Sequence, residues 1–222
     1  MAHAIGFDIY GTLVNPLEMD RHLEPVVGEL AGRFSEVWRA RQVEYAFRRG
    51  LMREYRDFGV CTRQALEFAA RSLGVELSEE EREHLIAEYQ NLRPFPDVLP
   101  GLERMKSGGH EMVAFSNGVE QTARTLLERA GVMQYLDGVV SVDDVATFKP
   151  DPEVYAYLAR RLNLPAEEVW LVSSNAWDVI GAKSFGLRAA WLQRDPEAVF
   201  DPWGLEPDLV AGDLLELSEK LA

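Results

Sequence analysis

Residues 4–13 of the chain read AIGFDIYGTL, a short apolar run that ends in an aspartate and a turn. The run at residues 4–9 has the length and composition of a buried strand, and Tyr10-Gly11-Thr12 favours a turn after it. Asp8 therefore stands at the carboxyl end of the first strand. Because ligands of open parallel sheets bind beyond the carboxyl ends of the strands, this stretch also marks a candidate site.

Five further apolar runs resemble buried strands. They lie at residues 112–115, 138–141, 169–172, 189–192 and 208–210. Helical patterns at residues 120–130, 152–162 and 175–185 separate most of them, and Asp151 and Pro152 suit the N-cap and first position of the second helix. Strands alternating with helices predict an α/β fold with a Rossmann-like parallel sheet covered on both faces.

Residues 18–91 follow a different, helical pattern. The breaks in this pattern are expected near three glycines, Gly50, Gly59 and Gly74. Ser78 and Glu81 form a capping-box signature ahead of a further helix. Three prolines then mark a linker: Pro94, Pro96 and Pro100. We therefore predict an α/β core at residues 1–15 and 95–222, interrupted after its first strand by an all-helical cap domain at residues 16–94.

Composition narrows the class of protein. The 222 residues are 47% hydrophobic and 27% charged, as in a globular protein with a substantial core. The formal net charge of -14 disfavours nucleic acid and anionic membranes as partners. Cys61 is the one cysteine, expected to be buried, and it permits no internal disulfide. With no signal-peptide pattern or membrane-spanning run, we expect a cytoplasmic protein.

Polar side chains of the types used in catalysis follow the predicted strands. They are Asp8 and Thr12 after the first strand, Ser116-Asn117-Gly118 after the second, Lys149 before the helix at 152–162, and Ser173-Ser174-Asn175 with Asp178 after the fourth. Each alone has an ordinary structural explanation, such as a turn, a helix cap or a surface lysine. Together, and in this order, they predict an active site at one edge of the sheet.

These motifs resemble those of the haloacid dehalogenase superfamily. The matching stretches are residues 7–13, Ser116-Asn117-Gly118, Lys149-Pro150-Asp151-Pro152 and residues 173–178, and the helical insertion lies where that superfamily places its cap. The phosphatase branch has an acid two residues after the nucleophile, where this chain has Tyr10, and further acids for Mg²⁺ where this chain is neutral up to Asp178. A halide leaving group needs no proton, so dehalogenation would permit these departures from the phosphatase pattern.

The resemblance is sharpest to the L-2-haloacid dehalogenase family, with Trp38-Arg39 and Tyr155 among the matching residues. It implies a metal- and cofactor-independent hydrolase that converts short (S)-2-haloalkanoic acids to (R)-2-hydroxy acids and halide through an aspartyl ester. Asp8 would be the nucleophile, Asp178 the base that activates water, and Lys149 the cation that stabilises charge in both steps.

The remaining site residues receive their roles from the same resemblance. The catalytic carboxylates would be oriented by Thr12, Ser173 and Asn175. The substrate carboxylate would be bound by Ser116 and Asn117. On the cap, Arg39 would bind the substrate and meet the departing halide. The rest of the predicted substrate site comprises Tyr10, Phe58 and Trp177 as an apolar wall, together with Tyr155.

Several alternatives stay open. The same Asp8 serves in Mg²⁺-dependent phosphatases acting on small phosphomonoesters, and an inactive scaffold could serve in binding or regulation. Arg39 is preferred to Arg41 because it follows Trp38 as in the family. None of the four histidines stands in a ligand-like pair, so no metal role is assigned. Oligomeric state stays open: the resemblance implies a possible homodimer, and three apolar residues on the cap could serve its interface, although core packing explains them equally: Phe47, Leu51 and Met52.

Overall fold

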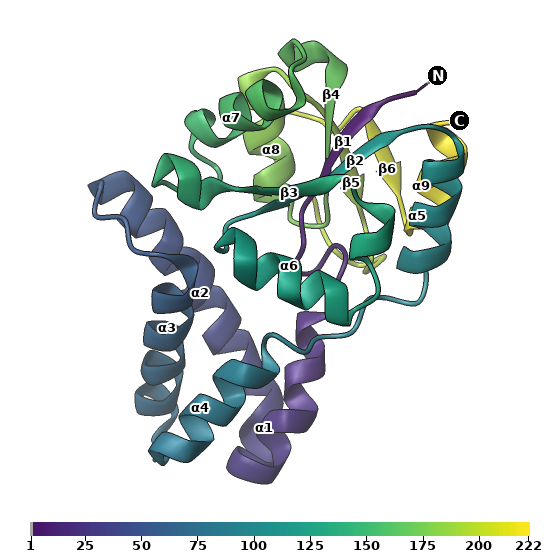
Figure 1. The fold of residues 1–222 in the computed structure, drawn as a ribbon. Coiled ribbons are helices and arrows are strands. Elements are labelled where there is room, and N and C mark those ends of the chain that lie inside the picture. Colours follow the sequence, from purple (N-terminus) through teal and green to yellow (C-terminus); the bar gives the residue numbers. More distant parts are fainter. Residues whose placement is uncertain (1) are drawn as a thin grey trace.

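The computed structural model describes residues 2–222. Within them, one parallel six-stranded sheet has the order β3-β2-β1-β4-β5-β6 (Figure 1). Its strands are β1 (Ala4–Phe7), β2 (Glu111–Ser116), β3 (Gly138–Ser141), β4 (Val169–Ser173), β5 (Arg188–Leu192) and β6 (Leu209–Ala211). Phe7 at the end of β1 is in register with Ala114 of β2 and Val172 of β4. Asp8 therefore emerges between two neighbouring strand ends.

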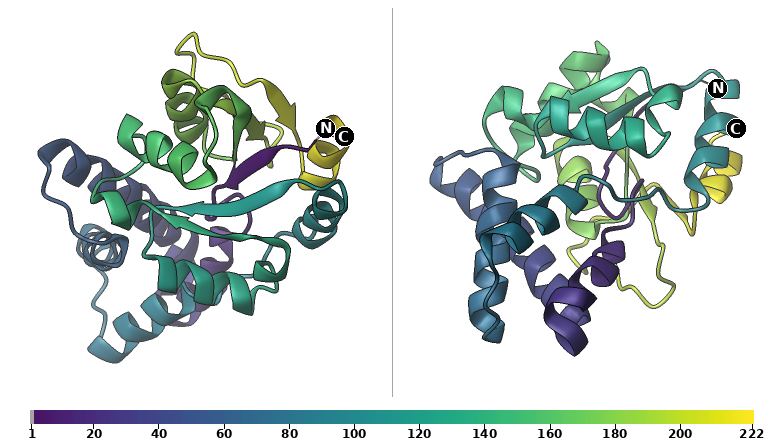
Figure 2. Two further views of the ribbon diagram at one scale, coloured as in Figure 1. Left: turned by 45° about the horizontal axis from the view of Figure 1, so that its top comes forward. Right: turned by 60° about the horizontal axis from the view of Figure 1, so that its bottom comes forward.

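Helices cover both faces of the sheet, as the alternating pattern predicts (Figure 2). The helices α5 (Val98–Ser107), α6 (Glu120–Arg129) and α9 (Leu214–Lys220) share one hydrophobic cluster with Ile5 and Phe7. The helices α7 (Pro152–Leu162) and α8 (Ala176–Phe185) share the other cluster with Ala4 and Phe115. A Cβ on Gly6 would lie 2.8 Å from Leu158 of α7, so this glycine permits the close approach of helix and sheet.

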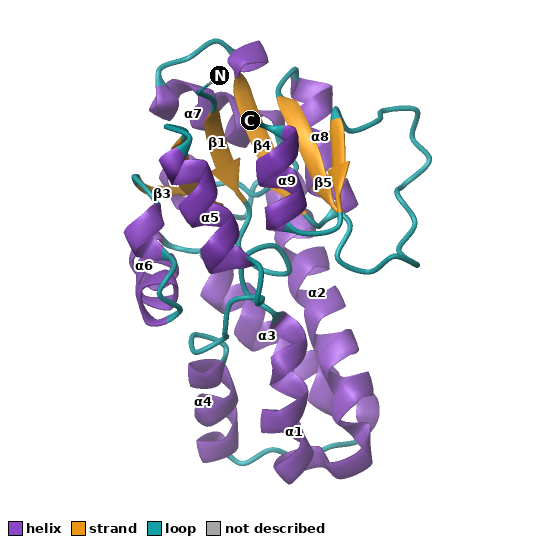
Figure 3. Ribbon diagram, turned by 90° about the vertical axis from the view of Figure 1, so that its right-hand side faces the viewer, coloured by secondary structure: helices purple, strands orange, loops and turns teal. Residues whose placement is uncertain are grey.

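The segment between β1 and α5 is helical, and it extends away from the sheet (Figure 3). It contains α1 (Asp20–Val27), α2 (Ala31–Met52), α3 (Phe58–Leu73) and α4 (Glu79–Glu88). The buried Trp38 of α2 donates from Nε1 to the carbonyl of Thr62 in α3, at 2.9 Å. The short 3-10 helices of the described chain are η1 (Pro16–Met19), η2 (Gly28–Leu30), η3 (Met133–Tyr135), η4 (Val142–Val145) and η5 (Ala166–Glu168). The exact domain boundaries at 15/16 and 94/95 stay a prediction.

The breaks expected near Gly50 and Gly59 are one break, at residues 53–57, and Pro100 lies in a helix instead of a linker. Gly50 is inside α2, which continues to Met52 and ends at Arg53 in the left-handed conformation. Gly59 is in the first turn of α3, because the side chain of Asp57 caps that helix. Pro100 is also in the first turn of a helix, α5, where proline is tolerated because its missing N–H would have no helical partner.

Other local signals match the structure closely. Gly74 terminates α3 in the left-handed conformation that glycine adopts readily. Ser78 and Glu81 form the complete capping box of α4, and Asp151 caps α7 with Pro152 at its start. Cys61 is fully buried. Within residues 2–222, no helix combines the length and apolar character needed to cross a membrane.

Candidate active site

Asp8 is held by side chains from two strand ends. Its Oδ2 accepts hydrogen bonds from Thr12 Oγ1 at 3.0 Å, Ser173 Oγ at 3.3 Å and Asn175 Nδ2 at 2.8 Å. Its Oδ1 accepts from Lys149 Nζ at 3.2 Å. Three donors on Oδ2 fix the carboxylate plane, and Oδ1 is left as the less encumbered oxygen.

The local backbone explains this arrangement. Gly11 has φ +86°, and a Cβ there would lie 3.1 Å from Ser174 Oγ, so the tight turn after β1 requires glycine. The turn brings Thr12 back towards Asp8, and Thr12 Oγ1 also accepts from the backbone N–H of Ser174 at 2.9 Å. Asn175 occupies the N-cap position of α8, but its amide bonds Asp8 and the Tyr10 carbonyl rather than its own helix.

Lys149 lies between the two predicted catalytic carboxylates. Its Nζ is 3.2 Å from Asp8 Oδ1 and 2.9 Å from Asp178 Oδ2, and it lies 4.3 Å from the centre of the Phe115 ring. The side chains of Lys149 and Asp178 are 1% and 0% exposed, whereas that of Asp8 is 12% exposed. Of the three, Asp8 alone presents surface that a substrate can reach.

The pKa values of Lys149 and Asp178 are both raised, for different reasons. Burial disfavours the ammonium of Lys149, but the charges of Asp178 and Asp8 outweigh it and raise its pKa above the ordinary 10.5. Burial also raises the pKa of Asp178 above 3.8, against the opposing pull of Lys149. Lys149 is therefore a persistent cation, and Asp178 is a more basic carboxylate than a solvated aspartate.

Tyr155 takes a position different from the one expected for a substrate-binding residue. The side chain is fully buried, and its hydroxyl donates to Asp178 Oδ1 at 2.8 Å. Burial and the neighbouring Asp178 raise the pKa of this hydroxyl, which therefore stays a donor. The geometry suits orientation of Asp178 better than contact with substrate.

The second motif also lies at this edge. Ser116 Oγ accepts from the backbone N–H of Gly118 at 2.9 Å, and Ser141 Oγ donates to the Gly118 carbonyl at 2.8 Å. Asn117 Oδ1 accepts from the backbone N–H of Lys149 at 3.0 Å. These bonds fix the loop after β2 against the one that carries Lys149, and α6 begins two residues after Gly118.

The cap contributes Arg39 to the site, and the structure separates it from Arg41. Arg39 donates to the Tyr10 carbonyl at 3.3 Å and to Gln42 Oε1 at 3.2 Å. Arg41 instead pairs with Glu44 and lies over the ring of Phe68. The choice of Arg39 therefore agrees with the geometry.

The residues that hold Arg39 were not predicted from the sequence. Gln42 is fully buried; its Oε1 also accepts from Tyr89 OH at 3.1 Å, and its Nε2 donates to Thr62 Oγ1 at 2.6 Å. The one signal in the sequence was the three-residue spacing of Arg39 and Gln42, which places them on one face of a helix.

The predicted apolar wall divides into two parts. The rings of Tyr10 and Phe58 lie 6.4 Å apart, and Tyr10 also contacts Tyr89 at 5.5 Å. Trp177 packs instead against Phe47 at 5.0 Å. Trp177 and Phe47 line a groove of about 560 Å³ whose lining also includes Lys149, Trp203 and Leu51. A common wall of Tyr10, Phe58 and Trp177 stays a prediction.

The arrangement suits covalent catalysis by a carboxylate. A partly exposed aspartate, fixed by four donors, faces a buried lysine that links it to a second, more basic carboxylate. Among residues 2–222, one group alone brings three metal-ligand side chains within reach of one ion, and it lies elsewhere, at His22, His84 and Glu88.

Comparisons with known proteins agree with the fold and identify the family. A family model described as haloacid dehalogenase-like hydrolase matches residues 2–186. The chain is 34% identical to an (S)-2-haloacid dehalogenase of Pseudomonas fluorescens, over 97% of this chain and 94% of that protein. An L-2-haloacid dehalogenase from Xanthobacter autotrophicus, solved with chloropropionic acid covalently bound, superposes with a TM-score of 0.91 at 30% identity, covering 100% of this chain and 98% of that one. The chain therefore belongs to the haloacid dehalogenase-like hydrolases, within the branch of the 2-haloacid dehalogenases, as the motifs at its strand ends predict.

Proposed function

We propose that this protein hydrolyses short (S)-2-haloalkanoic acids to (R)-2-hydroxy acids and halide. One observation carries the proposal: Asp8, held on Oδ2 by three donors, presents Oδ1 beside the ammonium of Lys149. The similarity to a dehalogenase solved with covalently bound chloropropionic acid supports a covalent route.

In the first step, Asp8 Oδ1 attacks the carbon that bears the halogen. The C–O bond forms as the C–halogen bond breaks, and the halide leaves with the electron pair. This single displacement inverts the carbon. Arg39, the cap residue held over Tyr10, is the cation we assign to the departing halide. Ser116 and Asn117 are assigned to the substrate carboxylate.

In the second step, water attacks the ester carbon of Asp8, and Asp178 takes its proton. The carbonyl oxygen of the ester is the former Oδ2, so the negative charge that develops on it lies beside Thr12, Ser173 and Asn175. Preorganised donors of this kind stabilise an oxyanion. Collapse of the intermediate releases the alkoxide, which takes the proton held by Asp178 and leaves as the hydroxy acid. The second proton of the water molecule is lost to solvent, and Asp8 is regenerated as a carboxylate.

The test is halide release from L- and D-2-chloropropionate, with and without EDTA. We expect the L-substrate to be turned over at equal rates in both conditions, and chiral analysis to find D-lactate. Retention of configuration would exclude the single displacement. Loss of activity with EDTA and recovery with Mg²⁺, together with release of phosphate from phosphomonoesters, would favour the phosphatase alternative. Turnover of neither substrate class would favour a binding protein.

We also propose a cytoplasmic homodimer. Leu51 and Met52 at the end of α2 are 87% and 62% exposed, and Trp203, which lines the same groove as Leu51, is 74% exposed. Burying such side chains would favour association. The single buried thiol of Cys61 suits a reducing compartment. Light scattering of the wild-type protein and of a Leu51→Glu variant tests the dimer.

A further inference from the structure

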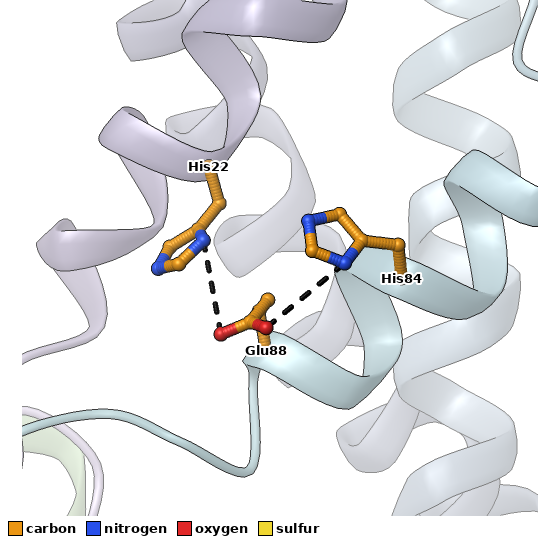
Figure 4. Close-up of side chains that lie close together, drawn as sticks. All are labelled: His22, His84 and Glu88. Atoms are coloured by element: carbon orange, nitrogen blue, oxygen red, sulfur yellow. Dashed lines mark ion pairs between the residues drawn. The ribbon is translucent and has the colours of Figure 1, made fainter.

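A second cluster of polar side chains lies in the helical cap (Figure 4). Nδ1 of His22 is 3.7 Å from Glu88 Oε2, and Nδ1 of His84 is 3.9 Å from Glu88 Oε1. The two imidazole rings are 6.3 Å apart at their centres and are steeply inclined to each other. One nitrogen or oxygen from each residue lies within 4.8 Å of the other two.

The fold assembles this cluster from two helices. His84 and Glu88 are one turn apart on α4, so they share a face of that helix. His22 comes from α1, and buried Leu23 and Leu85, one from each helix, belong to the same hydrophobic core. The cluster therefore lies at a packed seam and is not an accident of one exposed loop.

We propose that this seam binds a divalent transition metal ion, with Zn²⁺ as the ion of choice. Two imidazoles and one carboxylate are ligands that zinc accepts, and three protein ligands leave a fourth, tetrahedral position for water. The site is separate from the Asp8 chemistry, and its role is to join α1 to α4.

The distances allow a metal with small side-chain movements. Zinc bonds of about 2.0–2.1 Å separate tetrahedral ligand atoms by about 3.3–3.5 Å. The contacts of 3.7 and 3.9 Å go to different oxygens of Glu88, and one ligand atom from each residue lies within 4.8 Å of the others, so the side chains must turn to bring three atoms onto one ion. The side chains of His22, His84 and Glu88 are 27%, 53% and 23% exposed, so they have room to turn and an ion has a path to them.

The three side chains approach one another as ion pairs without hydrogen bonds (Figure 4). Among the described residues, no hydrogen bond joins His22, His84 and Glu88 to one another, although both Nδ1 atoms face the same carboxylate. The distances of 3.7 and 3.9 Å exceed those of charge-assisted hydrogen bonds, about 2.7–2.9 Å. The helix itself is acidic, with the sequence EEEREHLIAE, so it favours a bound cation.

The experiment uses untagged, full-length protein that has been stripped with EDTA and dialysed at pH 7.5. Calorimetric titration with Zn²⁺ should give one site per chain with a micromolar or lower Kd. His84→Ala should weaken binding at least about tenfold, since losing even an outer partner of a ligand costs about 10–100-fold. His84 is half exposed, so this variant should fold normally.

Two matched variants separate this site from other binding. Glu80→Gln removes one exposed charge from the same helix, and His3→Ala disrupts the stacked pair His3 and His110 elsewhere in the fold. Both should keep the wild-type Kd. An absence of zinc binding, or binding that His84→Ala leaves unchanged while His3→Ala removes it, would overturn the proposal.

Thermal unfolding gives an independent readout. Free Zn²⁺ at about 100 times Kd should raise the Tm by roughly 5–10 °C in the wild type and much less in His84→Ala. The shift should become smaller as the pH is lowered, because protons compete with the metal for its ligands. A Tm that does not respond to zinc at pH 7.5 would contradict a structural site. Dehalogenase activity measured well below the Tm should be unchanged by zinc removal.

Discussion

The sheet edge and the helical cap both reach the active site, but they hold their polar groups in different ways. At the sheet edge, short side chains attached directly to strand ends fix Asp8 with three hydrogen bonds on one oxygen. From the cap, the long side chain of Arg39 donates one hydrogen bond to a backbone carbonyl of the core and a second one to Gln42 of its own helix. In the proposed mechanism, the sheet would therefore set the reaction geometry, and the cap would adjust contact with the leaving group.

The largest expected effect is at the nucleophile. Asp8→Ala should lower kcat by at least about 10⁴-fold, because no other accessible carboxylate faces Lys149 in residues 2–222. Under single turnover in H₂¹⁸O with enzyme in excess, the product hydroxyl should be unlabelled and the Asp8 peptide should gain mass. Label found at once in the product, with none in the peptide, would mean that Asp8 only activates water.

Lys149→Met should come next, with about 10³-fold or greater loss of activity and a large loss of stability. It leaves two carboxylates without their buried cation, which costs about 3–5 kcal/mol of unfolding free energy. Thermal and urea unfolding measure this loss. Lys149→Arg keeps the charge and should be more stable than Lys149→Met, and the reverse order would contradict the role of charge.

Asp178→Asn should slow ester hydrolysis more than ester formation, by about 10²–10³-fold. A covalent adduct on Asp8 should then accumulate after mixing with L-2-chloropropionate. Intact-protein mass spectrometry detects it as an increase equal to the substrate without its halogen. The Asp8→Ala variant, treated in the same way, is the control. Equal slowing of both steps with no adduct would remove Asp178 from the role of base.

Changes on the cap should be milder. Arg39→Lys should lower kcat/KM by about 10–100-fold, since an ammonium cannot reproduce the two-point contact of the guanidinium. The loss should be greater for chloride than for bromide, which leaves more readily. Arg41→Lys is the matched control, because Arg41 pairs with Glu44 away from the site, and it should stay within about twofold of wild type. Equal losses in both variants would point to a general effect on α2.

The smallest expected effect is that of alkaline pH. Lys149 has a pKa raised above 10.5, so kcat/KM should fall by less than about twofold between pH 8 and 10. The stability that its pairing contributes is fully present below pH 10.5 and is lost as the pH rises through the folded-state pKa. A pH–rate profile, corrected for non-enzymatic hydrolysis, and the Tm over the same range check this. An alkaline limb well below pH 10 would mean that another group controls activity.

The sheet edge could be predicted well from the sequence because its signals are local. An apolar run that leads into Asp8 and a glycine specifies both a strand and the turn after it, and a parallel sheet then brings such strand ends together. The order of strands, with β1 between β2 and β4, is consistent with the Rossmann-like sheet expected from the alternating pattern.

The cap was harder to predict, for physical reasons. Glycine only weakly disfavours a helix, so neighbouring residues decide where a helix begins. The side chain of Asp57 starts α3, and Gly59 therefore falls inside this helix. The group of His22, His84 and Glu88 joins helices whose residues are far apart in sequence. The four-residue spacing of His84 and Glu88 was visible, but the approach of His22 depends on how α1 packs against α4.

The three hydrogen bonds on Asp8 Oδ2 also affect which oxygen atom enters each product. If they keep the carboxylate from rotating between turnovers, the oxygen delivered by water always returns to the reactive side, beside Lys149. Each product would then carry the oxygen that the preceding water molecule brought. In labelled water the second product would be fully heavy, whereas a carboxylate that rotates freely would give one that is half labelled.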